Sequence, residues 1–281
     1  MKISIGVVLY YPSITEVNRV INFSKTFSDV YVYDNTPETS HEEYFNTPGI
    51  HYYFNASNDG LSVALNNICK NAINHGYNFI ITMDQDSIIS NESLFSIQEF
   101  IKNNDMEKVG IVAPAIIYDH NRVKEQPLFE RGFEYIEWTI TSGSAVNLDV
   151  YKKTSGFDEN YFIDRLDYDY CILLQKLNYY IIQLKGVYLY QSLGEQKKGI
   201  LKNYSTHNPL RHYYMFRNRL YFYFKKQNIT FYRLSKLILA ASKHLLQIIF
   251  IEEDKAKKIR MIMESFKDFI NGKMGKYIGK Y

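Results

Sequence analysis

The sequence predicts an α/β protein with a mostly parallel sheet that carries helices on both faces, followed by a helical C-terminal appendage. Two observations favour this fold class. Short apolar runs alternate with segments of helical spacing through the first half of the 281-residue chain. Several of these runs end on Asp, Asn or Pro, as strands that lead into loops do. Ligands bind beyond the carboxyl ends of such strands, so polar residues there are the first candidates for a site.

Each element follows from the residue pattern. The expected strands cover residues 3–10, 29–33, 51–54, 79–83, 109–113 and 181–190, and the expected helices cover 15–27, 61–76 and 167–177. The polar segment 194–204 is rich in Gly and Lys, which predicts a mobile loop. The chain is expected to be helical and basic from His207 onward. We therefore expect one α/β domain over 1–220 and a helical region over 221–281.

Composition narrows the function classes. The formal net charge is +3, which gives no indication of a nucleic-acid partner. Cys69 and Cys171 are the two cysteines, which fits a reducing cytoplasm rather than a disulfide scaffold. No signal peptide is expected, because the N-terminus leads directly into a strand. The most apolar stretch, 234–251, contains Lys236 and Lys243, so no membrane span is predicted.

Two carboxylates, Asp84 and Asp86, stand one residue apart after the apolar run FIITM. Hard divalent cations prefer carboxylate oxygens, with water and ligand phosphates completing the coordination shell. A cation there would stabilise a departing diphosphate as negative charge develops. The alternative is a plain turn, because Asp and Ser are common turn residues.

Three further features stand at strand or helix ends. Asp34 ends the second strand and either accepts hydrogen bonds from a base or ribose or belongs to a plain turn. Asn58 precedes Gly60 at a helix start, where backbone N–H groups hold anions, although Asn58 is also a good N-cap. Ser142 and Gly143 either let a substrate approach the backbone or form a tight turn.

Acidic residues gather at the start of a later helix, in the run FIDRLDYDY. The helix dipole favours acids at this position, but Asp164, Asp167 and Asp169 exceed what capping requires. One of them, poised near an acceptor hydroxyl, would serve as a general base. Asp167 is the central candidate.

A basic helix is expected after His207. Arg211 lies four residues further on, and Asn218 follows the same helical face, whereas Arg217 is displaced from it. A guanidinium can grip a diphosphate through paired hydrogen bonds. The alternative is an exposed basic helix without a ligand.

Taken in order, seven stretches resemble the family 2 glycosyltransferases, which have the GT-A fold, and most closely their bacterial rhamnosyltransferase branch. They cover the chain from about residue 3 to 220 and read GVVLYYP, VYVYDNT, NDGLSVALN, FIITMDQDS, TSGSAVN, GFDENYFIDRLDYDYCILLQ and HNPLRHYYMFRNR. The resemblance implies an inverting enzyme that moves L-rhamnose from dTDP-rhamnose to a hydroxyl of a growing, lipid-linked cell-surface glycan of the cell wall or capsule. It also implies Mg²⁺ or Mn²⁺. Another donor, such as a UDP-hexose or UDP-galactofuranose, and a non-catalytic nucleotide-sugar-binding protein are the alternatives.

The resemblance also assigns roles to residues. Asp167 is expected to be the general base, and Asp84 and Asp86 the metal ligands. The expected donor-binding residues are Leu9, Tyr10, Asp34, Asn58, Gly60, Asp84, Gln85, Asp86, Arg211, Arg217 and Asn218. The expected acceptor-binding residues are Ser142, Gly143, Asp164 and Asp169.

The sequence departs from the family pattern at two positions. Leu166 stands where the wider family has a Glu before the base, and Gln191 stands where related enzymes have a metal-binding His. His207 is therefore a candidate replacement ligand. A nucleotidyltransferase is disfavoured, because such enzymes have a Gly-rich loop after the first strand, where this chain has Tyr10-Tyr11-Pro12-Ser13.

The region from residue 231 to the end mixes apolar positions with many Lys and Arg. A basic amphipathic helix can lie on an anionic membrane surface. The alternatives are a helical appendage packed on the α/β domain and a contact between two copies in a homodimer. We expect a cytoplasmic protein that is peripheral at the inner face of the cell membrane.

Overall fold

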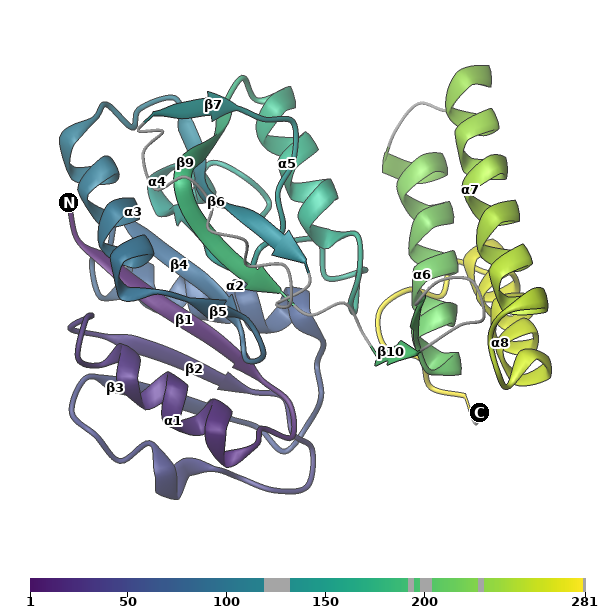
Figure 1. Cartoon of the computed structure of the whole chain (residues 1–281), viewed down its shortest axis with the longest axis horizontal. Coiled ribbons are helices and arrows are strands. Elements are labelled where there is room, and N and C mark those ends of the chain that lie inside the picture. Colours follow the sequence, from purple (N-terminus) through teal and green to yellow (C-terminus); the bar gives the residue numbers. More distant parts are fainter. Residues whose placement is uncertain (119–131, 192–194, 198–203, 227–229, 280–281) are drawn as a thin grey trace.

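The computed structural model describes residues 1–118, 132–191, 195–197, 204–226 and 230–279. Figure 1 shows a twisted sheet between two layers of helices, with a separate group of helices beside it. The described strands form a nine-stranded sheet in the order β3-β2-β1-β4-β8-β6-β9-β5, with β7 paired to β9. The predicted fold class is therefore confirmed.

The first four strands of the sheet order are parallel. They are β1 (Ile3–Leu9), β2 (Val30–Asp34), β3 (Ile50–Phe54) and β4 (Phe79–Asp84). Leu9 pairs with Asp34 and Val8 pairs with Asp84, so the carboxyl ends of β1, β2 and β4 meet at one edge of the sheet. This register brings the predicted polar residues of three separate segments to the same place.

The other half of the sheet is mixed. The parallel strands β6 (Val109–Tyr118) and β9 (Tyr180–Gln191) are joined to β4 through β8 (Ser144–Asn147), which is antiparallel to both β4 and β6. Two short antiparallel strands, β5 (Ile88–Ile89) and β7 (Phe133–Tyr135), pair with β9. The sequence did not predict β5, β7 or β8. Because β8 runs against β4, it begins where β4 ends and delivers the preceding loop to the site edge.

Helices cover both faces of the sheet. One face carries α1 (Ile14–Phe23) and α3 (Asn91–Asn103), and the other carries α2 (Leu61–Asn74), α4 (Leu148–Tyr151) and α5 (Leu166–Lys176). A single 3₁₀ turn, η1 (Glu42–Tyr44), follows β2. Burial on both faces explains why the central strands are continuous apolar runs rather than alternating ones. Cys69 and Cys171 are buried, free thiols in the second core, as expected.

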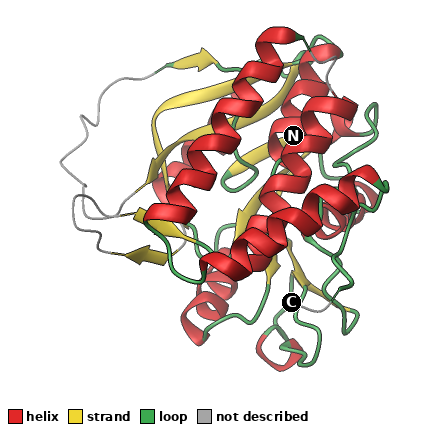
Figure 2. Cartoon of the chain, turned by 90° about the vertical axis from the view of Figure 1, so that its right-hand side faces the viewer, coloured by secondary structure: helices red, strands yellow, loops and turns green. Residues whose placement is uncertain are grey.

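The C-terminal helices form their own unit, which faces the viewer in front of the sheet in Figure 2. It consists of α6 (Pro209–Tyr221), a π-helical turn η3 (Phe222–Lys226), α7 (Phe231–Phe250) and α8 (Lys255–Ile270). The short strands β10 (Glu195–Lys197) and β11 (Tyr204–Thr206) pair with each other, and the rest of the expected loop 194–204 lies outside the described residues. No helix in the described ranges is long and apolar enough to cross a membrane.

Helix α6 belongs with α8 in space, although it precedes the expected boundary at residue 220. Tyr213 and Tyr214 pack with Met261, and Phe162 and Ile163 from the α/β domain pack against this small core. The helical unit therefore begins near residue 209, and it touches the α/β domain immediately before α5.

Gly60 fixes the approach of the segment before α5 to the start of α2. Its φ of 89° and ψ of 169° lie in a region that essentially only glycine adopts. A Cβ atom there would lie 2.6 Å from the carbonyl oxygen of Phe162. That same oxygen accepts a hydrogen bond of 2.7 Å from the N–H of Leu61. Any side chain at position 60 would therefore push residue 162 away.

We expect Gly60→Ala to lower the free energy of unfolding by about 3 kcal/mol or more, from backbone strain and a clash that cannot relax. Gly76→Ala is the matched control, because Gly76 has φ 76° and nothing within 4 Å of a built Cβ. Gly76→Ala should lower the free energy of unfolding by only about 1–2 kcal/mol, because the left-handed conformation is its only cost. Urea denaturation measures both, and equal losses would rule out the close contact at Phe162.

Candidate active site

A closed ring of hydrogen bonds holds Asp84 at the carboxyl end of β4. The N–H of Asp84 donates to Ser142 Oγ at 3.0 Å, and Ser142 Oγ donates to Ser87 Oγ at 2.8 Å. Ser87 in turn donates to the side-chain oxygen of Gln191, and Gln191 Nε2 donates to Asp84 Oδ2 at 3.3 Å. These four residues come from three different segments, so the ring fixes the position of the Asp84 carboxylate.

Gln85 ties the end of β4 to the end of β1. Its Oε1 accepts from the N–H of Tyr10 at 2.7 Å, and its Nε2 donates to the carbonyl of Tyr10 at 3.1 Å. Arg19 from α1 donates to the carbonyl of Gln85 at 2.6 Å. The loop that carries Asp86 is thus held from both sides, and the Asp86 side chain remains exposed.

The carboxylates at this edge repel one another. The pKa of Asp84 is raised to about 7, mainly by burial and then by the charges of Asp86 and Asp167. Burial also raises the pKa of Asp86, and it raises the pKa of Asp167 to about 6. The charge of Arg211 lowers the pKa of both Asp84 and Asp86. The charged side chains of Asp84, Asp86, Asp167 and Arg211 therefore act on one another at one site, although they are far apart in the sequence. Carboxyl groups with such shifted pKa values are typical of functional sites.

A strained turn places Asp167. Asp164 and Arg165 have φ values of 67° and 71°, both in the left-handed region that side chains rarely adopt. Arg211 holds Asp164 by an ion pair of 2.8 Å, and Asn218 Nδ2 donates to the carbonyls of Ile163 at 2.6 Å and Asp164 at 3.3 Å. The turn ends at α5, and Asp167 stands in the first turn of that helix. Helix α6 thereby sets the position of the candidate base.

Two α6 residues predicted to bind the donor are occupied within the protein. Arg217 is only 1% exposed, and its guanidinium donates to the Tyr213 hydroxyl, to Asn218 Oδ1 and to the carbonyl of Gly275. Asn218 is fully buried against the turn before α5. The structure contradicts direct donor contacts for both. Arg211 is half-buried, its Nη2 pairs with Asp164, and its Nε is buried without a hydrogen-bond partner among the described residues, so a donor contact of Arg211 stays a prediction.

The predicted acceptor-binding residues mostly have structural roles. Ser142 is buried in the ring around Asp84, and the N–H of Gly143 donates to the Thr82 carbonyl at 2.7 Å. Asp169 is buried and lies 3.3 Å from Lys226 Nζ. The Ser142 and Asp169 side chains are therefore engaged within the protein, and acceptor contacts of these three residues stay predictions. For Asp164, which is partly exposed, the contact stays a prediction.

Asp34 is fully buried and orders the loop after β2. Its carboxylate hydrogen-bonds to the N–H of Thr36 at 2.9 Å, to His41 Nδ1 at 2.7 Å and to the Tyr52 hydroxyl at 2.7 Å. The side chain of Leu9 lies in the core. Neither side chain is available to a nucleotide, so a donor contact of either residue would come from its backbone and stays a prediction.

The start of α2 also differs from the prediction. Its N-cap is Gly60 rather than Asn58. The Asn58 side chain accepts from the N–H of Gly60 at 3.1 Å, and the N–H of Leu61 donates to Phe162. The N–H groups of Gly60 and Leu61, two of those expected to hold an anion, are therefore already bonded. Asn58 and Gly60 shape the contact with the segment before α5 instead.

The ring contact that the structure shows for His207 is with the helical unit. Burial lowers its pKa, as does the charge of Arg211, and the other charges acting on it are those of Asp164, Glu252 and Lys258. Its ring packs edge-on against His212 in the helical unit. Within the described ranges no cluster of three His, Cys, Asp or Glu side chains is arranged to hold a metal. The structure gives no support to His207 as a replacement for the missing family His.

Sequence reasoning missed several residues of the site. Ser87 and Arg19 hold the loop after β4, and Gln191, noted in the sequence only as a departure from the family's metal-binding His, donates a hydrogen bond to Asp84. Ser87 follows Asp86 directly, which is a usable signal. Arg19 carries no sequence signal, because nothing in an amphipathic helix shows that one side chain reaches a loop 66 residues away.

Comparison with known proteins gives the class of protein. The family model described as glycosyl transferase family 2 matches residues 19–162, which contain β2 to β4, Asp84 and Asp86. The chain belongs to this family and is a glycosyltransferase.

A particular relative extends the match beyond that segment. The chain is 25% identical to the dTDP-rhamnosyl transferase RfbF of Shigella flexneri over 285 residues, covering 96% of this chain and 95% of the relative. The match includes the C-terminal helices, so the helical unit is part of what the two proteins share.

Solved structures show the same fold. GalNAc-T7 with UDP, GalNAc and Mn²⁺ superposes with a TM-score of 0.60 at 10% identity, covering 96% of this chain. TarS of S. aureus superposes with a TM-score of 0.52 at 18% identity, also over 96% of this chain. This chain spans 56% and 49% of the length of those two chains. Both comparisons support the GT-A fold.

Proposed function

We propose that the protein is an inverting rhamnosyltransferase that uses dTDP-rhamnose and glycosylates a hydroxyl of a growing, lipid-linked cell-surface glycan. The donor assignment is supported by the likeness to RfbF over nearly the whole of both chains. The chemistry is supported above all by the placement of Asp167 in the first turn of α5, close enough to Asp84 at the carboxyl end of β4 for its charge to help raise the pKa of that carboxyl. A base and a diphosphate-binding acid pair on one edge are what a single displacement requires.

The acidic edge fits a divalent cation. Asp84 and Asp86 offer only oxygen ligands, and the repulsion that raises the pKa of Asp84 would be relieved by a positive ion. Mg²⁺ and Mn²⁺ both accept such carboxylates together with water and phosphate oxygens. When bound, the ion would neutralise charge on the departing nucleotide diphosphate. Asp84 and Asp86 are the residues proposed to hold it.

In the proposed mechanism Asp167 accepts the proton of the acceptor hydroxyl. The oxygen then forms a bond to the anomeric carbon from the side opposite the donor diphosphate, and the bond from that carbon to the diphosphate breaks. Asp167 must be ionised to act, and its pKa of about 6 leaves it mostly ionised at neutral pH. Arg211 is proposed to meet the diphosphate with its partly exposed guanidinium, whose charge acts on both Asp84 and Asp86.

Asp167→Asn should reduce the transfer rate by about 10²- to 10⁴-fold, the usual contribution of a general base, while leaving donor binding nearly intact. In the unsubstituted enzyme the rate should rise with pH through about 6 and then level off, because only the ionised carboxylate accepts a proton. Asp169→Asn is the matched control. Asp169 stands in the same helical turn but is paired with Lys226, so its loss should affect stability rather than the pH profile. A rate in Asp167→Asn within a few-fold of the original would remove Asp167 from this role.

The donor class is tested by thermal shift with dTDP-rhamnose, UDP-glucose, UDP-galactose and UDP-galactofuranose, each with Mg²⁺ or Mn²⁺. We expect selective stabilisation by dTDP-rhamnose, lost in Asp86→Ala. The part of the increase in melting temperature that depends on the metal should be larger at pH 8 than at pH 6. At pH 6 a cation must displace the proton from Asp84, whose pKa is about 7. Stabilisation by a UDP-sugar alone would replace rhamnose with that sugar, and no response to any donor would favour a non-catalytic protein.

We also propose a division of labour, with donor chemistry at the edge of the α/β domain beside α6 and a membrane-surface role for the C-terminal region that follows α6 (221–281). Helix α7 supports this with large apolar side chains on one exposed face: Phe231, Ile238, Leu239, Leu246, Ile249 and Phe250. A helix with such a face can lie at the boundary between lipid headgroups and acyl chains. A lipid-linked acceptor would be met at that surface.

A double substitution, Ile238→Glu with Phe250→Glu, should abolish sedimentation with anionic phospholipid vesicles, because each buried apolar side chain contributes about 1.5–3 kcal/mol. These side chains are 58% and 74% exposed, so the fold should tolerate the change. Phe95→Glu on α3 is the control, at 61% exposure. Vesicle binding that survives the double substitution would contradict the proposal. A concentration-dependent dimer that the double substitution dissociates would assign the face to a homodimer instead.

A further inference from the structure

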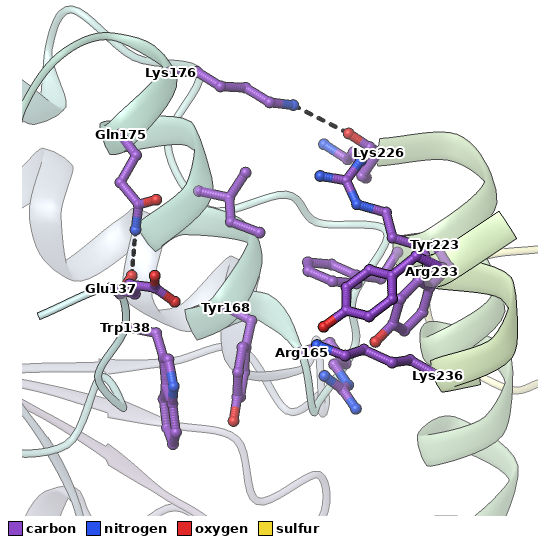
Figure 3. A pocket seen from close by; sticks show the side chains of 13 residues that line it. Glu137, Trp138, Arg165, Tyr168, Gln175, Lys176, Tyr223, Lys226, Arg233 and Lys236 are labelled. Carbon is purple, nitrogen blue, oxygen red and sulfur yellow. Dashed lines mark hydrogen bonds between the residues drawn. The ribbon is translucent and has the colours of Figure 1, made fainter. Parts of the chain in front are cut away.

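A groove of about 720 Å³ runs between α5 and the C-terminal helices, beside the candidate base rather than at the donor edge. Figure 3 shows its two walls: Trp138 and Tyr168 on the α5 side, and Tyr223, Arg233 and Lys236 on the side of the helical unit. None of the predicted site residues lines it. The proposed mechanism therefore leaves the groove without a function.

One wall is an aromatic platform. Trp138, the single tryptophan of the chain, stacks on Tyr168 with ring centroids 4.4 Å apart and an angle of 21° between the planes. Trp138 is still 42% exposed, so part of its ring remains open. The Gln175 side chain donates to the carbonyl of Glu137 and fixes this segment against α5. A rigid aromatic surface with polar edges suits the apolar face and hydroxyls of a sugar ring.

The groove is strongly basic. Among the described residues, its lining includes Arg165, Lys176, Lys226, Arg233 and Lys236 against one carboxylate, that of Glu137. Lys226 forms an ion pair with Asp158 at 2.7 Å, which neutralises its charge. Arg165 and Lys236 contact aromatic rings instead.

Arg165 and Lys236 lie over aromatic rings. The Arg165 guanidinium is 5.0 Å from the Tyr168 ring centroid, and Lys236 Nζ is 4.3 Å from that of Tyr232. A ring orients a cation without cancelling its charge. Within the described ranges no carboxylate lies at ion-pair distance from either cation, so a positive field remains in the groove for an anionic ligand.

The groove lies next to the candidate base along the chain, although Asp167 itself is not among the lining residues. Arg165 and Tyr168 flank Asp167 in the chain, and Tyr168 follows it within the first turn of α5. The left-handed conformations of Asp164 and Arg165 separate their side chains, with Asp164 toward Arg211 and Arg165 toward the groove. Strained backbone of this kind persists where surrounding contacts over-determine it, often at functional sites.

We propose that this groove binds the acceptor, and that the acceptor is a saccharide carrying a phosphoryl group. Trp138 and Tyr168 hold the sugar ring, and Arg165 and Lys236 hold the phosphate or diphosphate. Arg suits phosphate because its planar fork donates two parallel hydrogen bonds. The role of the groove as an acceptor site rests on the proposed glycosyl transfer, but the binding of a phosphorylated saccharide can be measured without transfer.

The test is calorimetric binding of three probes to the full-length protein without donor or metal: a short-chain prenyl diphosphate N-acetylglucosamine, N-acetylglucosamine 1-phosphate and the neutral methyl glycoside. The phosphorylated probes should bind, and the methyl glycoside should bind at least about tenfold more weakly, the usual worth of a charge-assisted hydrogen bond. Tighter binding of the prenyl diphosphate would identify a lipid-linked source, and tighter binding of the monophosphate a soluble one.

Lys236→Gln and Arg165→Gln should each weaken the phosphorylated probes about tenfold and leave the neutral glycoside unchanged. Trp138→Ala should weaken all three probes. Lys243→Gln, two turns further along α7 and outside the groove lining, is the matched control and should change nothing. Equal binding of charged and neutral probes, or full affinity in Lys236→Gln and Arg165→Gln, would overturn the proposal. The donor thermal shift is read separately, so a failed donor assignment would not be mistaken for a failed groove.

Discussion

The grip of α6 on the turn before α5 is the contact on which the active site depends. Asn218 binds two successive carbonyls of this turn, and Arg211 binds the Asp164 side chain. Without these partners the left-handed residues Asp164 and Arg165 would relax, since each such conformation costs about 1–2 kcal/mol. The position of Asp167 relative to β4 would then be lost.

The donor edge has the opposite problem, which is an excess of like charge. Asp84 is held by a ring of neutral hydrogen bonds, so its own charge is left uncompensated apart from Arg211. Such a carboxylate is poorly stabilised in the free protein and well placed to gain from a cationic ligand. The site is thus preorganised in geometry but incomplete in charge, which favours tight binding of a metal and diphosphate together.

The sequence was sufficient for features that depend on local pattern. The parallel strands, the polar residues at their ends and the acids at the start of α5 all follow from periodicity and turn chemistry. It was insufficient where the outcome depends on a distant partner. Arginine is usually exposed, and nothing in the local sequence predicts that α8 and the segment after it bury the side chain of Arg217. The sequence of the short strand β8 contains no local signal that it pairs antiparallel to both β4 and β6. The groove combines Trp138, Tyr168 and Lys236, whose proximity no spacing rule predicts.

The location of α6 has a consequence for evolution and for engineering. The family-matched segment ends at residue 162, one residue before the carbonyls that Asn218 binds. Both partners of this contact therefore lie outside the segment that the family model matches, directly after its end. Recombination that swaps the C-terminal helices between two relatives would separate partners unless the crossover precedes the turn at 163–165. Variation in acceptor use is accordingly expected to arise by substitution within the groove walls rather than by exchange of whole tails.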